Sequence, residues 1–147
     1  MRNAETKPKR DIGERTLRFA LRIVKLANAL PQTVAGEIIA RQAMRSGTGV
    51  GANVEEAQAA STPKKFSRRM QIAQSEARVA MYWRRLASEP GMVKRERING
   101  SLTEADELVR ILTVISKRAS KRSKMRGAPL IPYSAFNIPH SIEMRCQ

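Results

Sequence analysis

The sequence predicts an all-α protein that folds as an antiparallel up-down four-helix bundle. Apolar residues make up 41% of the 147 residues, which is enough for the core of one domain, whereas aromatic residues make up only 4%. A core built mainly from aliphatic side chains favours helix packing over a β-sandwich. Apolar residues also recur at helical spacing in four segments, which capping and proline signals separate.

The first helix is expected to start after a capping pattern at Asp11 and to end before Pro31. Its predicted apolar stripe consists of Leu17, Ala20, Leu21, Val24 and Ala27. The second helix is expected from Val34 or Ala35 to about Ala60. Its predicted apolar line consists of Ile38, Ile39, Ala43, Val50, Val54 and Ala57.

Three alternating glycines interrupt the second helical pattern between residues 46 and 51. Each glycine costs roughly 1 kcal/mol relative to Ala in a helix interior. The segment is either a loop that splits the helix or a continuous helix whose glycines allow a neighbour to approach closely. A phosphate-binding loop is excluded, because Asn53 and Glu55 follow where such a loop needs a lysine and a hydroxyl residue.

The third helix is expected to run from Pro63 to about Ser88, because Thr62 before Pro63 is a favoured start. Its predicted stripe consists of Phe66, Met70, Ala73, Ala77 and Ala80, widened by Ile72, Val79, Trp83 and Leu86. A capping box at residues 101–104 predicts the start of the fourth helix, after a linker at 92–100. Its predicted stripe consists of Ala105, Leu108, Leu112, Ile115 and Ala119.

The charge pattern points to an anionic partner. The net charge is +15 and the isoelectric point is about 11.2. A field of this sign favours polyanions, of which nucleic acid is the most common; an anionic membrane surface and a purely solubilising surface are the alternatives. Phosphate contacts are expected from clusters in the third and fourth helices: Lys64, Lys65, Arg68, Arg69, Arg84 and Arg85, and Lys117, Arg118, Lys121 and Arg122.

The residues needed for catalysis or metal binding do not cluster in the sequence. His140 is the one histidine and Cys146 the one cysteine, and both lie in the last residues of the chain. Neither a metal site nor a cofactor is expected, and an enzyme is improbable. The single cysteine and the absence of a long apolar run are consistent with a cytoplasmic protein.

The chain is expected to divide into a basic arm at residues 1–10, a bundle at 11–126 and a proline-rich tail at 127–147. Three hypotheses remain open for the tail: docking on its own bundle or a neighbouring one, disorder, or a short motif for another protein. A separate group of polar residues on the second helix is interpreted as a network that fixes helix register or an oligomer interface: Gln42, Arg45, Asn53 and Glu56.

The segment from Arg41 to Ala57 resembles the signature of the bacterial four helix bundle proteins, products of intervening sequences in large-subunit ribosomal RNA genes. The family pattern runs roughly Q-x-x-R-A-x-x-S-I-x-x-N-I-A-E-G. Its polar positions are matched by Gln42, Arg45, Asn53 and Glu56, and its isoleucines by Val50 and Val54. The segment from Glu76 to Leu86 resembles the family's E-A-R-x-x-x-Y-W-x-x-L pattern. Gly49, Gly51 and Ala57 depart from the signature.

The resemblance covers about residues 14 to 120 and implies an antiparallel four-helix bundle that assembles into a ring-like homopentamer. It also implies a basic surface for RNA or DNA, because related proteins are accessories of diversity-generating retroelements and work with a reverse transcriptase. Most members have no assigned activity. Two alternatives therefore stand beside nucleic-acid binding: a protein-interaction platform, and a membrane-surface binder that uses the basic first helix.

Overall fold

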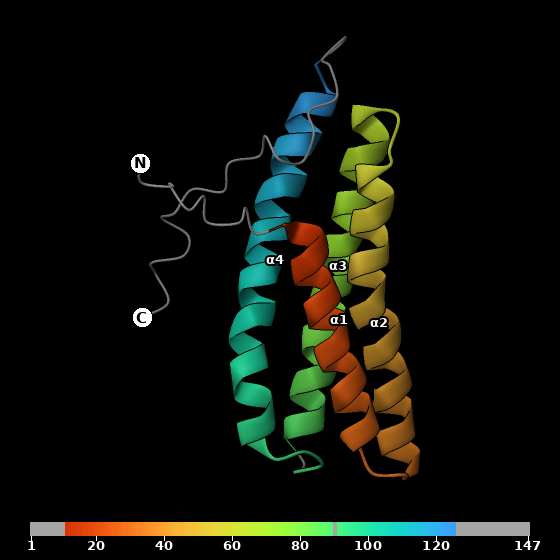
Figure 1. The fold of residues 1–147 in the computed structure, drawn as a ribbon, viewed down its shortest axis with the longest axis vertical. Helices are drawn as coiled ribbons and strands as arrows, with labels where there is room; N and C mark the ends of the chain where they lie inside the picture. The colour runs from red at the N-terminus through yellow and green to blue at the C-terminus, as the bar shows by residue number, and fades with distance from the viewer. Residues whose placement is uncertain (1–10, 90, 126–147) are drawn as a thin grey trace, which may run out of the picture.

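The computed structural model describes residues 11–89 and 91–125, which form four α-helices. They are α1 (Ile12–Ala29), α2 (Val34–Gln58), α3 (Pro63–Ser88) and α4 (Arg95–Ser123). Figure 1 shows them running alternately up and down, with α1 shorter than the other three. The prediction of an all-α up-down bundle is confirmed. The arm at 1–10 and the tail at 127–147 lie outside the described residues.

The starts of α1 and α3 follow the predicted capping chemistry. Asp11 Oδ1 accepts a hydrogen bond from the backbone N–H of Gly13 at 3.0 Å. Thr62 Oγ1 accepts one from the backbone N–H of Lys65 at 3.2 Å, with Pro63 in the first turn. These bonds satisfy backbone donors that a helix leaves without an internal partner.

The predicted stripes of α3 and α4 form the main core, which lies between the four helices. All five residues of each stripe are buried. The widening of the α3 stripe is only partly correct: Val79 and Leu86 are exposed, whereas Trp83 packs against the core. The residues of the regular stripe are therefore a better guide to burial than the residues added at its flanks.

The predicted core face of α1 is wrong. Leu17 and Leu21 are 54% and 53% exposed, and the core side consists of Ile12, Thr16, Phe19, Ile23 and Leu26. Both sets of residues follow a helical period, so the spacing alone does not choose between them. Packing against α2 decides, because Phe19 and Ile23 belong to the same core cluster as Val50.

The glycines of α2 lie within a continuous helix, so the second of the two hypotheses for residues 46–51 is correct. A Cβ atom added to Gly47 would lie 2.6 Å from Ile23 Cγ1, and one added to Gly51 would lie 3.6 Å from Thr16 Oγ1. Only the first of these distances is too short for a real contact. Among the glycines of α2 that face α1, Gly47 is therefore the one that α1 approaches most closely.

Helix α4 starts at Arg95, within the segment that was predicted to be a linker. The capping box predicted at residues 101–104 is wrong, because these residues lie inside the helix. Ile98 is only 2% exposed and packs with Leu26, Leu30 and Val93 in a second core cluster at this end of the bundle. Burial of Ile98 in this cluster therefore allows the helix to begin before the local capping signal.

Candidate nucleic-acid interface

The bundle topology brings the two predicted basic clusters together. Helices α3 and α4 are antiparallel neighbours, so the start of α3 lies beside the end of α4, at the upper end of the bundle in Figure 1. The Oγ atoms of Ser67 and Ser120 are 2.9 Å apart, and Gln71 Nε2 donates to Ser120 Oγ at 2.7 Å. Residues that are about fifty positions apart in the sequence thus share one surface.

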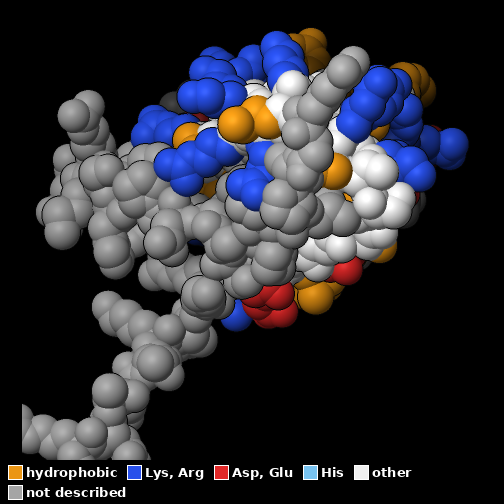
Figure 2. Space-filling view, turned by 90° about the horizontal axis from the view of Figure 1, so that it is seen from above, with side chains coloured by type: hydrophobic (Ala, Val, Ile, Leu, Met, Phe, Trp, Pro, Cys, Tyr) orange, Lys and Arg blue, Asp and Glu red, His pale blue; other side chains and the backbone are white. Residues whose placement is uncertain are grey.

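We call this surface the basic end. Seen from above in Figure 2, Lys and Arg side chains crowd much of its rim, whereas few Asp and Glu side chains are visible. Most of its side chains are exposed, whereas those of Arg69 and Arg122 are half-buried. It consists of Lys64, Lys65, Arg68, Arg69, Lys117, Arg118, Lys121 and Arg122.

Arg69 is engaged by two residues of the predicted polar network. Its Nη2 lies 2.6 Å from Glu56 Oε2, and its Nη1 donates to Asn53 Oδ1 at 3.2 Å. Asn53 in turn donates from Nδ2 to the carbonyl of Gly49 at 2.8 Å. The network thus joins α2 to α3 through Arg69, which leaves this guanidinium less available to phosphate than the exposed lysines.

The other two residues of the predicted network lie apart from this arrangement. Gln42 and Arg45 precede Asn53 by two to three turns of the same helix, in which the rise is about 1.5 Å per residue. Arg45 is exposed and Gln42 is half-buried. The structure therefore brings Asn53 and Glu56 together, and it leaves Gln42 and Arg45 farther along α2.

Arg84 corrects the sequence prediction, because it belongs to the core and cannot contact phosphate in the folded chain. It is 2% exposed, its Nη2 donates to the carbonyl of Ile98 at 3.2 Å, and its guanidinium carbon lies 6.0 Å from the centre of the Phe19 ring. Burial lowers the pKa of Arg84 to about 10; the positive charge of Arg22 also lowers it, and the negative charge of Glu104 raises it. The group therefore remains charged near neutral pH. Its neighbour Arg85 is exposed.

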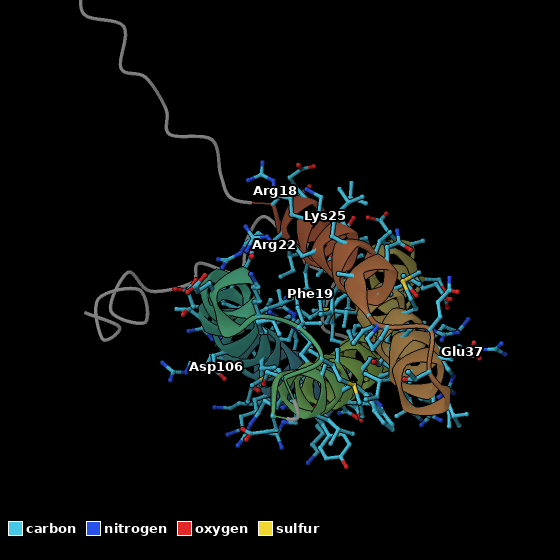
Figure 3. The ribbon with its side chains drawn as sticks, turned by 90° about the horizontal axis from the view of Figure 1, so that it is seen from below. Arg18, Phe19, Arg22, Lys25, Glu37 and Asp106 are labelled. Atoms are coloured by element: carbon cyan, nitrogen blue, oxygen red, sulfur yellow. The ribbon has the colours of Figure 1, made fainter. Side chains whose placement is uncertain are left out.

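The arginines of α1 are paired with carboxylates. Arg15 Nη2 lies 2.9 Å from Glu107 Oε2, and Arg22 forms an ion pair with Glu104, so both bridge α1 to α4. Arg18 pairs with Glu14 on its own helix at 3.1 Å. Figure 3 shows Arg22 beside α4 and Phe19 inside the bundle. The positive charge of α1 is thus largely balanced within the protein.

Acidic residues are scarce on α3 and on the second half of α4. Glu76 is the one acidic residue of α3, and a Cβ atom at Gly49 would lie 3.4 Å from its side chain, so Glu76 faces α2. Residues 108–125 contain neither Asp nor Glu. Residues 63–75 and 108–125, which contain the basic end, therefore carry cations and neither Asp nor Glu.

The sequence prediction missed two arginines of this region, Arg78 on α3 and Arg110 on α4. Both are exposed. Lys64, Arg68, Gln71 and Arg78 follow one another at intervals of four, three and seven residues, which places all of them on one side of α3. This helical spacing is the sequence signal that identifies Arg78.

The described residues offer little to a metal ion or a small molecule. No group of three or more His, Cys, Asp and Glu residues among them could hold a metal ion. A hollow of about 190 Å³ lies at the turn between α1 and α2, beside Ala27, Pro31 and Glu37. It is smaller than the roughly 300–1,000 Å³ of typical ligand sites. In the part of the chain that the structure describes, no helix is both long enough and apolar enough to cross a membrane.

Comparisons with known proteins agree on the family. The model of the 23S rRNA-intervening sequence protein family matches residues 9–114. A solved structure of a protein of unknown function from the S23 ribosomal protein family of Bacteroides thetaiotaomicron is 31% identical, with a TM-score of 0.68. The match covers 73% of this chain and 99% of that one. No curated protein matches the chain. The chain belongs to the 23S rRNA-intervening sequence protein family.

Proposed function

We propose that this protein is a non-enzymatic nucleic-acid-binding protein that acts as a homo-oligomer. The observation that carries the proposal is the basic end, where the start of α3 and the end of α4 combine their cations. Lysine and arginine side chains neutralise phosphates and release counterions, which supplies most of the affinity in non-specific binding. Such contacts position a nucleic acid without reading its sequence.

The family adds a reason to test RNA first. Its name refers to intervening sequences in 23S rRNA, and this chain matches its model over most of its length. Because the chain also resembles accessory proteins of retroelements, the proposal includes assistance to a reverse transcriptase. Both RNA and DNA carry the phosphates that the basic end would bind, so the proposal includes both.

Exposed apolar side chains support self-association. Leu17 and Leu21 lie one turn apart on α1, and Val79 and Leu86 lie two turns apart on α3. Apolar groups that gather on a surface commonly mark contacts with other proteins. A contact between two different faces of neighbouring copies would form a closed ring, as in the homopentamer that the family resemblance implies.

Fluorescence anisotropy of labelled single- and double-stranded RNA and DNA tests nucleic-acid binding. We expect a variant that changes Lys64, Lys65 and Arg68 to Glu to lose at least about tenfold in affinity, because each change removes a phosphate contact and adds repulsion. The matched control changes Arg41 and Arg45, which are exposed on α2, to Glu. Equal loss in both variants, or no loss in either, would contradict a specific role for the basic end.

The alternative is a protein-interaction platform, and the exposed α3 residues Val79, Tyr82 and Leu86 favour it. This alternative predicts no binding to any of the four nucleic-acid probes, even at low salt. It also predicts that substitutions in the apolar group, and not those at the basic end, abolish binding to the partner. Binding of the unmodified protein to the four probes thus distinguishes the two functions.

A further inference from the structure

The exposed side of α3 that faces away from α2 carries a row of basic and uncharged residues, which runs from Lys64 to Arg85. Its exposed residues recur at alternating intervals of four and three, which keeps them on one side of a helix. None of them is acidic. The row consists of Lys64, Arg68, Gln71, Ser75, Arg78, Tyr82 and Arg85.

Helix α4 carries a second row beside the first. Its exposed cations Arg110, Lys117, Lys121 and Lys124 follow intervals of seven, four and three residues. The one acidic residue in line with them is Asp106, which Figure 3 shows on the outside of α4. The second row is thus basic from residue 110 to its upper end.

Hydrogen bonds fix how the two rows stand relative to each other. Ser67 contacts Ser120 at 2.9 Å, and Gln74 Nε2 donates to Thr113 Oγ1 at 2.7 Å. The same antiparallel register places Arg78 level with Arg110, and Arg68 level with the turn that contains Lys117 and Lys121. Like charges therefore face each other across a line of uncharged hydroxyl and amide groups.

Like charges repel, so an anion that contacts both rows would lower the electrostatic energy of this face. On other sides of the bundle, Arg15 and Arg22 pair with glutamates of α4, and Arg69 pairs with Glu56. The α3–α4 face thus combines facing cations with neutral hydrogen-bonding groups. Phosphate and sugar oxygens are the partners that this combination fits.

We infer that a double-stranded nucleic acid lies lengthwise along the α3–α4 face, with the phosphates nearest the protein in contact with the cations of the two rows. The inference rests on the proposed function and extends it beyond the basic end. From Lys64 to Arg85 the row on α3 spans about 32 Å at 1.5 Å per residue. This length corresponds to about nine base pairs at 3.4 Å per step.

The scarcity of aromatic rings favours a duplex over a single strand. Proteins that bind single strands stack successive bases on several aromatic side chains. Among the described residues, Phe19 and Phe66 are buried, and Tyr82, which is 58% exposed, lies in edge contact with Trp83 at 5.2 Å between ring centres. Tyr82 alone offers one stacking position at the lower part of the row.

The test changes Arg78 and Arg85 to Gln, because both lie on the row but outside the cluster at the start of α3. A 20-base-pair RNA duplex, the matching DNA duplex and the RNA single strand serve as probes at several salt concentrations. We expect duplex affinity to fall about tenfold and the slope of log affinity against log salt to flatten by about 1.8, because two phosphate contacts are lost. The control changes Arg41 and Arg45 to Gln, on α2.

Three outcomes are decisive. A flattened slope for the duplex in the Arg78 and Arg85 variant, with an unchanged control, supports lengthwise binding, and comparison of the two duplexes identifies the nucleic acid. An unchanged slope in this variant, while changes at Lys64, Lys65 and Arg68 abolish binding, overturns lengthwise binding and leaves the proposed function intact. Tighter binding of the single strand than of both duplexes overturns the inference of a double-stranded partner.

Discussion

The Oγ atoms of Ser67 and Ser120 lie 2.9 Å apart and join the first turns of α3 to the last turns of α4. This contact sets the register in which the cations of the two helices face each other. Gln71 strengthens it through a second hydrogen bond to Ser120 at 2.7 Å. The surface that we propose for nucleic acid is therefore a consequence of how two helices pack, and neither helix carries it alone.

Gly47→Ala should destabilise the bundle, because the added Cβ atom would lie 2.6 Å from Ile23 Cγ1. Overpacking of this kind costs about 1–3 kcal/mol, and the higher helix propensity of Ala offsets up to about 1 kcal/mol. Urea denaturation followed by circular dichroism measures the change. Gly51→Ala is the matched control, since its Cβ atom would lie 3.6 Å from Thr16 Oγ1; this variant should be neutral or slightly more stable. Equal stability of the two variants would contradict the close approach of α1 at Gly47.

Glu104→Ala should destabilise the protein by about 2–3 kcal/mol. The substitution removes the carboxylate that pairs with Arg22 and that favours the charged form of the buried Arg84. Removing one partner of a fully buried pair costs about 3–5 kcal/mol, and the partial exposure of this pair reduces the effect. Glu14→Ala is the control, because the exposed pair of Glu14 and Arg18 should contribute less than about 1 kcal/mol. Similar losses in the two variants would show that the α1–α4 contact does not depend on Glu104.

Arg84→Met should lower stability but leave nucleic-acid affinity unchanged. The variant removes the hydrogen bond from Arg84 Nη2 to the carbonyl of Ile98 at 3.2 Å, and a hydrogen bond from a charged donor contributes about 1.5–3 kcal/mol. Thermal denaturation measures the first effect, and anisotropy at a temperature where the variant is folded measures the second. Arg85→Gln should show the reverse pattern. A loss of affinity in folded Arg84→Met would contradict the assignment of Arg84 to the core.

A double substitution of Leu17 and Leu21 by Gln should reduce self-association while the helix remains folded. Both side chains are more than half exposed, so the change removes little of the monomer's core. Sedimentation velocity over a range of concentrations gives the oligomeric state, and circular dichroism verifies helix content. An unchanged oligomer would exclude this face of α1 as a contact between copies and direct attention to Val79 and Leu86.

Residue spacing predicted the fold where one stripe dominates a helix. The stripes of α3 and α4 are buried as expected, and the capping pair of Thr62 and Pro63 starts α3 as expected. On α1, two apolar stripes compete, and packing against α2, where Ile23 lies against Gly47, selects the buried one. Tertiary contacts likewise extended α4, because Ile98 joins a core that local capping signals do not reveal.

The basic surface was predictable in part. Charge clusters identified most of the cations at the start of α3 and the end of α4. Arg84 lies four residues after Ala80 and continues the spacing of the buried stripe, whereas the exposed Arg85 does not. The groups that accommodate the buried charge, Phe19 and the carbonyl of Ile98, come from two other helices and were not predictable from this spacing. Ion pairing is equally nonlocal: Arg69 binds Glu56 across the α2–α3 contact, whereas its neighbour Arg68 is exposed.

The most direct test of the central claim is the salt dependence of duplex binding by the unmodified protein. The two rows on the α3–α4 face hold about eight cations. About six to eight phosphate contacts predict a slope of log affinity against log salt between about −5 and −7 for double-stranded RNA or DNA. A slope in this range, which flattens when Arg78 and Arg85 are replaced, would support nucleic-acid binding along this face. A slope near zero, or no binding at low salt, would contradict it.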